Sequence, residues 1–213
     1  MNLILFGPPG AGKGTQAHHI VVNHKYFQLS TGDLLRNEIK KKTSLGQNIE
    51  KIISDGKFVS DDVVNILLLN AIQKQENKNR IIFDGYPRNI SQAKNLEQIL
   101  NKGNQIIERI IVLNVSREII QKRILGRITC EKCNVTLNEF FNQKEIENHA
   151  CGKENLKRRR DDNQETVITR YDTYMEKTKP VLDFYSNHHG YHEIDGGLKI
   201  EEIKGKIDQI LRV

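Results

Sequence analysis

The sequence predicts an α/β protein in which five buried parallel strands form a sheet between two layers of helices. Short apolar runs alternate with longer helical segments along most of the 213 residues. This alternation is typical of parallel sheets, because each crossover between parallel strands needs a connecting helix. A glycine-rich turn, residues 7–15, joins the first apolar run to the first helical segment. Strand, glycine-rich turn and helix in this order predict a P-loop three-layer sandwich.

Each predicted element follows from its local pattern. Strands are expected at residues 3–6, 26–29, 80–85, 108–115 and 191–195, where apolar residues run together. Helices are expected at 16–23, 34–42, 45–54, 60–74, 91–101, 116–126, 162–185 and 199–212. Ser91 is expected to begin or cap its helix. Pro180 is expected to kink or divide the long helix 162–185, because proline lacks a backbone N–H.

Composition narrows the class of protein. Charged residues make up 28% and aromatic residues 6% of the chain, and no apolar run approaches the length of a membrane span. The chain opens in a strand without a basic and apolar leader, so we expect a cytoplasmic protein. Three cysteines in a reducing compartment indicate metal ligands or free thiols. The net charge of +6 is compatible with nucleic acid or with small polyanionic substrates.

The turn at residues 7–15 is suited to holding phosphates. Its glycines let several backbone N–H groups point at one anion, and the following helix start adds partial positive charge. Lys13 is placed to reach the terminal phosphates of a nucleotide, and the Thr15 hydroxyl to lie near bound Mg²⁺. Gly14 departs from the general pattern, which has Ser or Thr directly after the lysine.

Acidic and arginine residues follow at other strand ends and helix starts. Asp84 ends the third strand, where a carboxylate beside a phosphate loop holds the water shell of Mg²⁺. Planar, permanently charged guanidinium groups suit the charge that develops during phosphoryl transfer. The arginines in such positions are Arg36, Arg88, Arg123, Arg127, Arg159 and Arg170. The pattern therefore favours phosphates of a nucleotide as the target of the basic chain.

Five local sequences together resemble the adenylate kinases. They are residues 7–16, 29–36, 84–88, 126–127 and 159–162, and the resemblance extends over essentially the whole chain. Gly14 before Thr15 is usual in that family. The resemblance implies reversible transfer of the γ-phosphoryl group of ATP to AMP, which gives two ADP.

The resemblance also implies a role for each motif residue. ATP would be held by Gly10, Ala11, Gly12, Lys13, Gly14, Thr15 and Arg127. AMP would be held by Thr31, Arg36, Lys57, Val59, Gly85, Arg88, Gln92, Arg159 and Arg170, with the backbone acting at Lys57, Val59 and Gly85. Residues acting on the transferred group or its Mg²⁺ would be Lys13, Asp84, Arg88, Arg123, Arg159 and Arg170. Asp161 and Asp162 would tie the lid to the core or to its own arginines.

The family architecture divides the chain into three parts. The core would be 1–29, 60–125 and 161–213; the AMP-binding helical insert 30–59; and the ATP lid 126–160. Residues 30–59 are predicted to form two short helices. They are too polar for the central core, so we expect them to pack on one edge. Both inserts would close on the substrates and exclude water. The implied partners are ATP and AMP or ADP, with neither nucleic acid nor membrane, and the implied state is a monomer.

Long-lid members of the family hold a structural Zn²⁺ with four ligands, and this lid contains Cys130-Glu131-Lys132-Cys133. The expected ligand set is Cys130, Cys133, His149 and Cys151, which forms a small zinc-ribbon-like lid. Glu154 is the alternative fourth ligand, because it keeps the C-x₂ spacing after Cys151. A lid without metal and with three free thiols is the remaining alternative. The other six histidines are assigned no role, because His18-His19 and His188-His189 have no partners at ligand spacing.

Three other functions are alternatives to the adenylate kinase activity. A UMP or CMP kinase usually has a short lid and a small residue at the position of Thr31, so both features favour AMP. A zinc-ribbon nucleic-acid-binding protein could use the basic stretch 157–160, but it would have no use for the phosphate loop or Asp84. A nucleotide-binding regulator without turnover would be expected to lack Arg36 or Arg88, and both are present.

Overall fold

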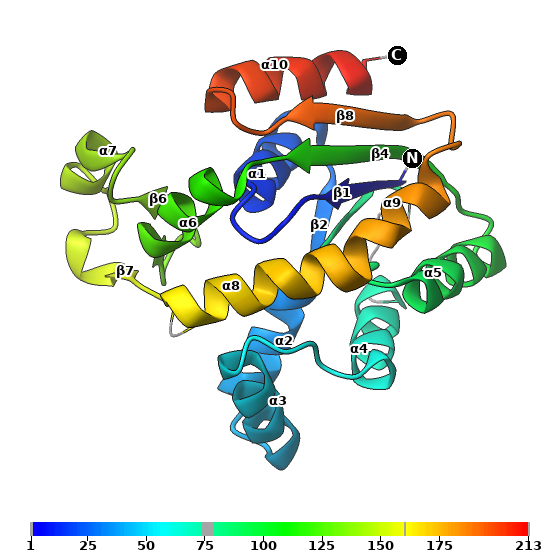
Figure 1. Cartoon of the computed structure of the whole chain (residues 1–213), viewed down its shortest axis with the longest axis horizontal. Coiled ribbons are helices and arrows are strands. Elements are labelled where there is room, and N and C mark those ends of the chain that lie inside the picture. Colours follow the sequence, from blue (N-terminus) through cyan, green and yellow to red (C-terminus); the bar gives the residue numbers. More distant parts are fainter. Residues whose placement is uncertain (1, 74–78, 160, 213) are drawn as a thin grey trace.

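The computed structural model describes residues 2–73, 79–159 and 161–212. At its centre is a five-stranded parallel sheet in the order β2-β3-β1-β4-β8 (Figure 1). Its strands are β1 (Asn2–Phe6), β2 (Phe27–Ser30), β3 (Ile81–Asp84), β4 (Ile107–Asn114) and β8 (Tyr191–Asp195). The predicted parallel sheet is confirmed, and each predicted strand lies within a residue or two of the observed one.

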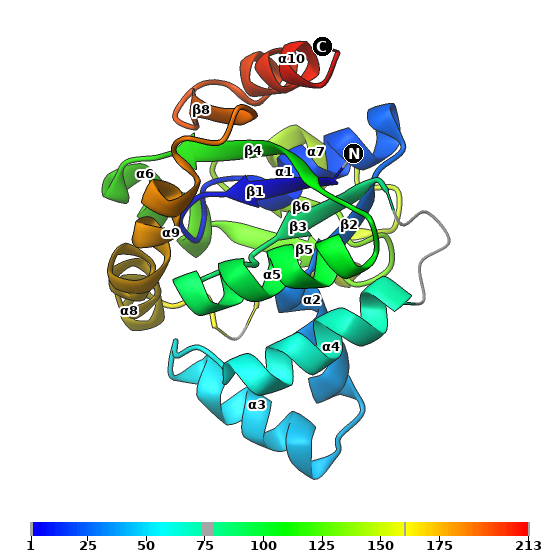
Figure 2. The ribbon, with the colours of Figure 1, turned by 90° about the vertical axis from the view of Figure 1, so that its right-hand side faces the viewer.

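Helices cover both faces of this sheet. The helices outside the lid are α1 (Lys13–His24), α2 (Thr31–Lys40), α3 (Ser44–Ser54), α4 (Asp61–Gln73), α5 (Ile90–Lys102), α6 (Arg117–Leu125), α8 (Gln164–Thr173), α9 (Lys179–Tyr185) and α10 (Ile200–Leu211). Figure 2 shows α5 and α4 on one side of the sheet and α10 at the opposite end of the molecule. The described part of the chain has no helix long and apolar enough to cross a membrane.

Side-chain alternation along β1 explains why the sheet is buried on both faces. Ile4 and Phe6 point into the larger apolar cluster, which α4, α5 and α9 close. Leu3 and Leu5 point to the other face and pack with Ile20 of α1 and Ile207 of α10. All four β1 side chains are at most 3% exposed. The central strand is therefore fixed in register by apolar contacts on both sides.

Two helices begin earlier than their apolar pattern predicts, because of side-chain caps. The Ser30 hydroxyl accepts a hydrogen bond from Asp33 N at 3.3 Å, so α2 starts at Thr31 rather than at residue 34. The Asn89 side chain accepts from Gln92 N at 2.8 Å and caps α5. Ser91 was therefore the wrong choice of cap and lies inside the first turn.

The long helix predicted at 162–185 is divided into three pieces. A π-helical turn, Tyr174–Thr178, separates α8 from α9. Pro180 lies in the first turn of α9, where its missing N–H removes no helical hydrogen bond. The predicted division is thus present, with the irregular turn just before the proline.

The two inserted segments lie on different sides of the core (Figure 1). Residues 127–157 form a small antiparallel sheet of β5 (Arg127–Cys130), β6 (Thr136–Asn138) and β7 (Leu156–Lys157), with α7 (Gln143–Glu147) between β6 and β7. The sequence had shown no strand there. Helices α2 and α3 are less separate from the core than expected, because Leu35 and Ile49 are buried in the larger apolar cluster.

Candidate active site

The carboxyl ends of the central strands bring the predicted motifs to one edge of the sheet. Asp84 at the end of β3 is in register with Leu5 of β1 on one side and with Ser30 of β2 on the other. The glycine-rich turn after β1, the start of α2 and the loop after β3 therefore lie side by side. Ligands of open parallel sheets bind at this edge.

The turn between β1 and α1 needs glycine at specific positions. Gly10 has a φ of 81°, and a Cβ there would lie 2.7 Å from Cγ1 of Ile124. Gly12 caps α1 with a φ of 95°, in the left-handed region that glycine favours. The turn is closed by a hydrogen bond from Ala11 N to Pro8 O at 3.1 Å. This backbone is a curled loop at a helix N-terminus, which is the arrangement that binds phosphates.

Lys13 lies inside the loop rather than in solvent. Its ammonium donates to Gly7 O at 2.7 Å and to Pro8 O at 3.0 Å. Burial lowers the pKa of Lys13 to about 8, although the nearby Asp84 carboxylate opposes the shift. Burial raises the pKa of Asp84, and the Gln28 amide donates to its Oδ2 at 2.8 Å. Gln28 was not predicted as part of the site, and its position on β2 opposite β3 is known only from the sheet order.

A second group of contacts surrounds Gly85. The Gly85 carbonyl accepts from Thr31 Oγ1 at 2.7 Å and from Arg88 Nε at 2.8 Å. Gln92 Oε1 accepts from Arg88 N at 2.7 Å, while Gln92 Nε2 donates to Asp61 at 2.6 Å. These bonds fix the Arg88 backbone and turn its side chain toward the pocket.

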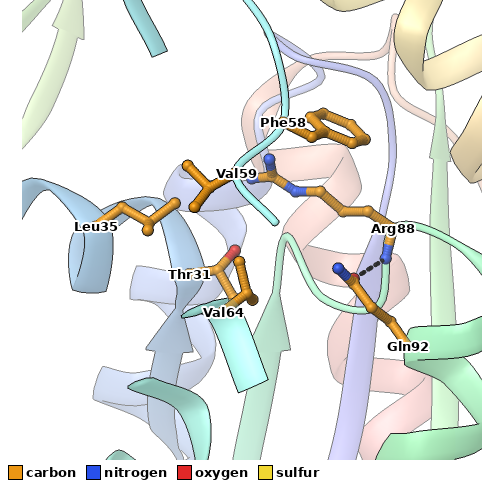
Figure 3. Close-up of a pocket in the computed structure, with 7 residues that line it drawn as sticks. All are labelled: Thr31, Leu35, Phe58, Val59, Val64, Arg88 and Gln92. Carbon is orange, nitrogen blue, oxygen red and sulfur yellow. Dashed lines mark hydrogen bonds between the residues drawn. The ribbon is translucent and has the colours of Figure 1, made fainter. Parts of the chain in front are cut away.

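The pocket beside Arg88 is formed by the loop after α3, the start of α2 and the loop after β3. Its lining residues are Thr31, Leu35, Phe58, Val59, Val64, Arg88 and Gln92 (Figure 3). The Arg88 guanidinium lies over the Phe58 ring, 4.7 Å from its centroid. Leu35 and Val64 were missed because an apolar residue in a helical pattern does not signal a pocket, and Phe58 because a single aromatic residue between two helices does not signal one either. The Lys57 side chain is exposed and pairs with Asp55 at 3.5 Å, outside this lining.

Four more of the predicted arginines make polar contacts near this edge. Three of them pair with carboxylates and the fourth, Arg123, contacts a backbone carbonyl. Arg36 Nη2 lies 2.5 Å from Asp33 Oδ1, and Arg170 Nη1 lies 2.8 Å from Asp161 Oδ2. Arg127 forms a two-pronged pair with Asp162, with one arm at 2.7 Å. Arg123 donates to Ala11 O in the glycine-rich turn at 3.2 Å.

Several cationic side chains lie close together at this edge. Their burial and mutual repulsion lower the pKa values of two of the arginines. Burial lowers the pKa of Arg88 to about 10, and repulsion from Arg170 adds to the shift. Burial also lowers the pKa of Arg159 to about 10, with contributions from Arg127 and Arg36. Arg160 lies outside the described residues. A polyanion bound between the guanidinium groups would stabilise these charges.

The lid brings together the four predicted metal ligands. One ligand atom from each of Cys130, Cys133, His149 and Cys151 lies within 4.8 Å of all the others. Hydrogen bonding from the backbone of Cys133 lowers the pKa of Cys130 to about 6, whereas a hydrogen bond with the Cys133 side chain raises that of Cys151 to about 11. The Glu154 carboxylate lies outside the group and accepts from Asn155 Nδ2 at 2.7 Å. The donor set fits a tetrahedral Cys₃His zinc site, with His149 favoured as the fourth ligand.

A family model described as adenylate kinase matches residues 5–190. The chain belongs to the adenylate kinase family. An adenylate kinase of Pelagibacter ubique (strain HTCC1062) is 63% identical over 213 residues and all of both chains. An adenylate kinase of Erythrobacter litoralis (strain HTCC2594) is 41% identical over all of both chains. One from Fusobacterium nucleatum subsp. nucleatum is 42% identical over 99% of this chain and 98% of its own. The resemblance drawn from five motifs is thereby confirmed.

Membership of the adenylate kinase family identifies the ligands of the protein. Adenylate kinases bind ATP and AMP or ADP and use Mg²⁺ together with ATP. The crowded arginines and the phosphate loop are the features such ligands require, because both substrates are polyanions. The Cys₃His group of the lid is compatible with a structural zinc.

Proposed function

We propose that this edge of the sheet clamps the phosphates of ATP and AMP in line for direct transfer. As an adenylate kinase, the chain catalyses reversible transfer of the γ-phosphoryl group from ATP to AMP. The observation that supports the clamp is the crowding of Lys13, Arg88, Arg159 and Arg170 at one place, with pKa values lowered by burial. Two bound polyanions would relieve that unfavourable burial.

On the ATP side, the loop amides of residues 10–15 would surround the β- and γ-phosphates, with Lys13 reaching the terminal ones. Thr15 and Asp84 would hold Mg²⁺ and its waters, and the ion would neutralise phosphate charge. Arg127 would lie along ATP at the start of the lid. Its pairing with Asp162 supports this place, because the pair joins the beginning and the end of the lid segment.

On the AMP side, Arg36 and Arg88 would grip the phosphate, and Thr31 and Gln92 would face the base with the backbone at Lys57, Val59 and Gly85. The lining of the pocket supports this assignment, since it combines four apolar side chains with the polar groups of Thr31, Arg88 and Gln92. Gln92 keeps one N–H and one lone pair free of the two bonds described above. Asp61 positions Gln92 by accepting its other N–H.

The transfer needs positioned charge more than acid–base chemistry. An oxygen of the AMP phosphate is already anionic at neutral pH, so it attacks the γ-phosphorus without losing a proton to the protein. The bond from the γ-phosphorus to the β–γ bridging oxygen breaks, and ADP leaves. Arg123, Arg159 and Arg170 would stabilise the negative charge on the three equatorial oxygens. Closure of residues 30–59 and 126–160 would exclude water, which competes with AMP as acceptor.

A comparison of acceptors tests this proposal. Purified protein with MgATP should phosphorylate AMP at a kcat/KM at least about a hundredfold above UMP and CMP, because a site built to hydrogen-bond one base rejects another strongly. UMP or CMP used as well as AMP would overturn the assignment of the base site. The nucleic-acid alternative has little support, because Arg159 is only partly exposed and Arg158 pairs with Glu139.

We propose a structural Zn²⁺ on Cys130, Cys133, His149 and Cys151. Cys133→Ser should lose one zinc per chain and lower the melting temperature, because binding free energy becomes folding free energy. His149→Ala should show the same losses and Glu154→Ala neither, by elemental analysis and calorimetry. Equal zinc content in His149→Ala and wild type would refute His149 as the fourth ligand, and no zinc in any protein would refute the site.

We further propose that the protein acts as a monomer in the cytoplasm. Both statements come from the family resemblance. None of the three cysteines forms a disulfide, as expected of metal-binding cysteines in a reducing compartment. Sedimentation at micromolar concentration should give the mass of a single chain, and a stable dimer would contradict the monomer.

A further inference from the structure

A second group of ligand-type side chains lies far from the lid, between the first and last helices. His19 and His24 of α1 and Asp208 of α10 place one ligand atom each within 4.8 Å of the other two. The His19 and His24 Nε2 atoms each lie 2.7 Å from the same oxygen, Oδ1 of Asp208. The two rings meet edge to face, 6.1 Å between centroids. This group could not be predicted from the sequence, because His24 follows His19 by five residues and Asp208 is far along the chain.

We infer that His19, His24 and Asp208 form a second metal site, for a divalent transition ion of the zinc type. Two imidazole nitrogens and one carboxylate oxygen are donors that zinc accepts, with water as the fourth ligand. In a tetrahedral site with bonds of about 2.0–2.1 Å, neighbouring ligand atoms are about 3.4 Å apart. The observed 2.7 Å between each nitrogen and the oxygen therefore needs to open by less than an ångström.

The surroundings allow an ion to enter and to be held. The side chains are partly buried, with exposed fractions of 12%, 19% and 25% for His19, His24 and Asp208, so the group is ordered but open to solvent on one side. Although burial opposes the shift, hydrogen bonds from His24 and His19 lower the pKa of Asp208, so its carboxylate is charged at neutral pH. Apolar packing of α1 against α10 holds the two helices together without the metal.

Metal binding requires both imidazoles in one tautomer. In the present arrangement each Nε2–H donates to Asp208, and Asn23 Nδ2 lies 3.0 Å from His19 Nδ1. With an ion on Nε2, the ring hydrogen has to lie on Nδ1 of each imidazole. Asn23 is exposed and its Nδ2 also donates to His19 O at 3.0 Å, so the amide would have to move aside for Nδ1–H to donate to water, the kind of second contact that metal-bound histidines usually have.

The test compares zinc per chain in wild type, Asp208→Asn and His18→Ala after equilibration with micromolar free Zn²⁺. Asp208→Asn keeps the size and the hydrogen-bond acceptor but removes the charge, and it should hold one zinc fewer than wild type. His18 is exposed and outside the group, so His18→Ala should match wild type. Because the readout is the difference between proteins, it holds whether or not the lid binds zinc. Equal zinc in wild type and Asp208→Asn would overturn the site, and so would a loss in His18→Ala.

Cobalt distinguishes the two sites spectroscopically. Co²⁺ in the lid should give near-ultraviolet thiolate charge-transfer bands, whereas Co²⁺ on nitrogen and oxygen should give only weak visible bands. Asp208→Asn should lose the weak component alone and retain kinase activity. Free zinc at a hundredfold excess over its Kd should raise the melting temperature of wild type about 5–10 °C more than that of Asp208→Asn. Identical cobalt spectra and identical shifts in the two proteins would refute the site.

Discussion

Lys13→Met is expected to remove most turnover while leaving the fold intact. Lys13 is the cation inside the phosphate loop, held by Gly7 O and Pro8 O. Loss of one preorganised group that stabilises transition-state charge costs about a hundredfold to a thousandfold in kcat. The measurement is kcat with AMP and MgATP at saturation. Near wild-type turnover would contradict the proposed place of Lys13 on the ATP phosphates.

The same substitution should not destabilise the ligand-free protein. Burial lowers the pKa of Lys13 from 10.5 to about 8, so its charge is unfavourable in the folded chain at neutral pH. A methionine removes that penalty and should add between zero and about 3 kcal/mol to the free energy of unfolding. The gain is reduced because Asp84 loses a neighbouring cation. Lys122→Met, on the exposed face of α6, is the matched control for loss of charge and should keep full activity.

The pH dependence gives an independent check. Below pH 8, Lys13 is protonated in both folded and unfolded chains, so the penalty is constant. Between about 8 and 10.5, the unfolded chain binds the proton and the folded chain does not, so this residue makes stability rise with pH. Lys13→Met should lack that rise. Parallel stability curves for the two proteins over this range would show that the burial of the ammonium has no such effect.

The central sheet was predictable because its determinants are local and redundant. Strands β1, β3 and β4 are short runs of mostly apolar residues, and the helices between the strands keep their own apolar stripes. Helix starts were less predictable, since Ser30 and Asn89 act through single side-chain bonds that move a boundary by one to three residues. The lid strands were missed because β5, β6 and β7 have at most four residues each and no alternation long enough to detect.

The residues of the candidate site also differ in whether the sequence could predict them. Residues in the phosphate loop could be named because their spacing reflects chemistry, and those around Gly85 because the sequence resembles a known family. Gln28 and Asp61 could not, because they act by orienting Asp84 and Gln92 across elements that are distant in sequence. The pairing of His19 and His24 with Asp208 is the extreme case, since α1 and α10 lie at opposite ends of the sequence and are brought together only by the tertiary fold.

Arg88→Ala is expected to damage the use of AMP far more than the binding of ATP. The Arg88 backbone is fixed by Gln92 and its guanidinium lies between Gly85 O and the Phe58 ring, in the lining of the pocket proposed for AMP. A charged hydrogen bond is worth about 1.5–3 kcal/mol, so kcat/KM for AMP should fall at least about tenfold to a hundredfold. The Kd of ATP, measured without AMP, should change less than about threefold.

The fold should survive this change, because the guanidinium is itself an unfavourable buried charge that repels Arg170. Arg88→Lys keeps the charge but loses the planar fork, so it should recover part of the kcat/KM for AMP and confirm that geometry matters beside charge. Arg117→Ala, which removes an exposed arginine stacked on Tyr171, is the matched control and should leave both nucleotides unaffected. If Arg88→Ala weakened ATP binding as much as the use of AMP, Arg88 would belong to the ATP side, and the division of the site between the two nucleotides would have to be redrawn.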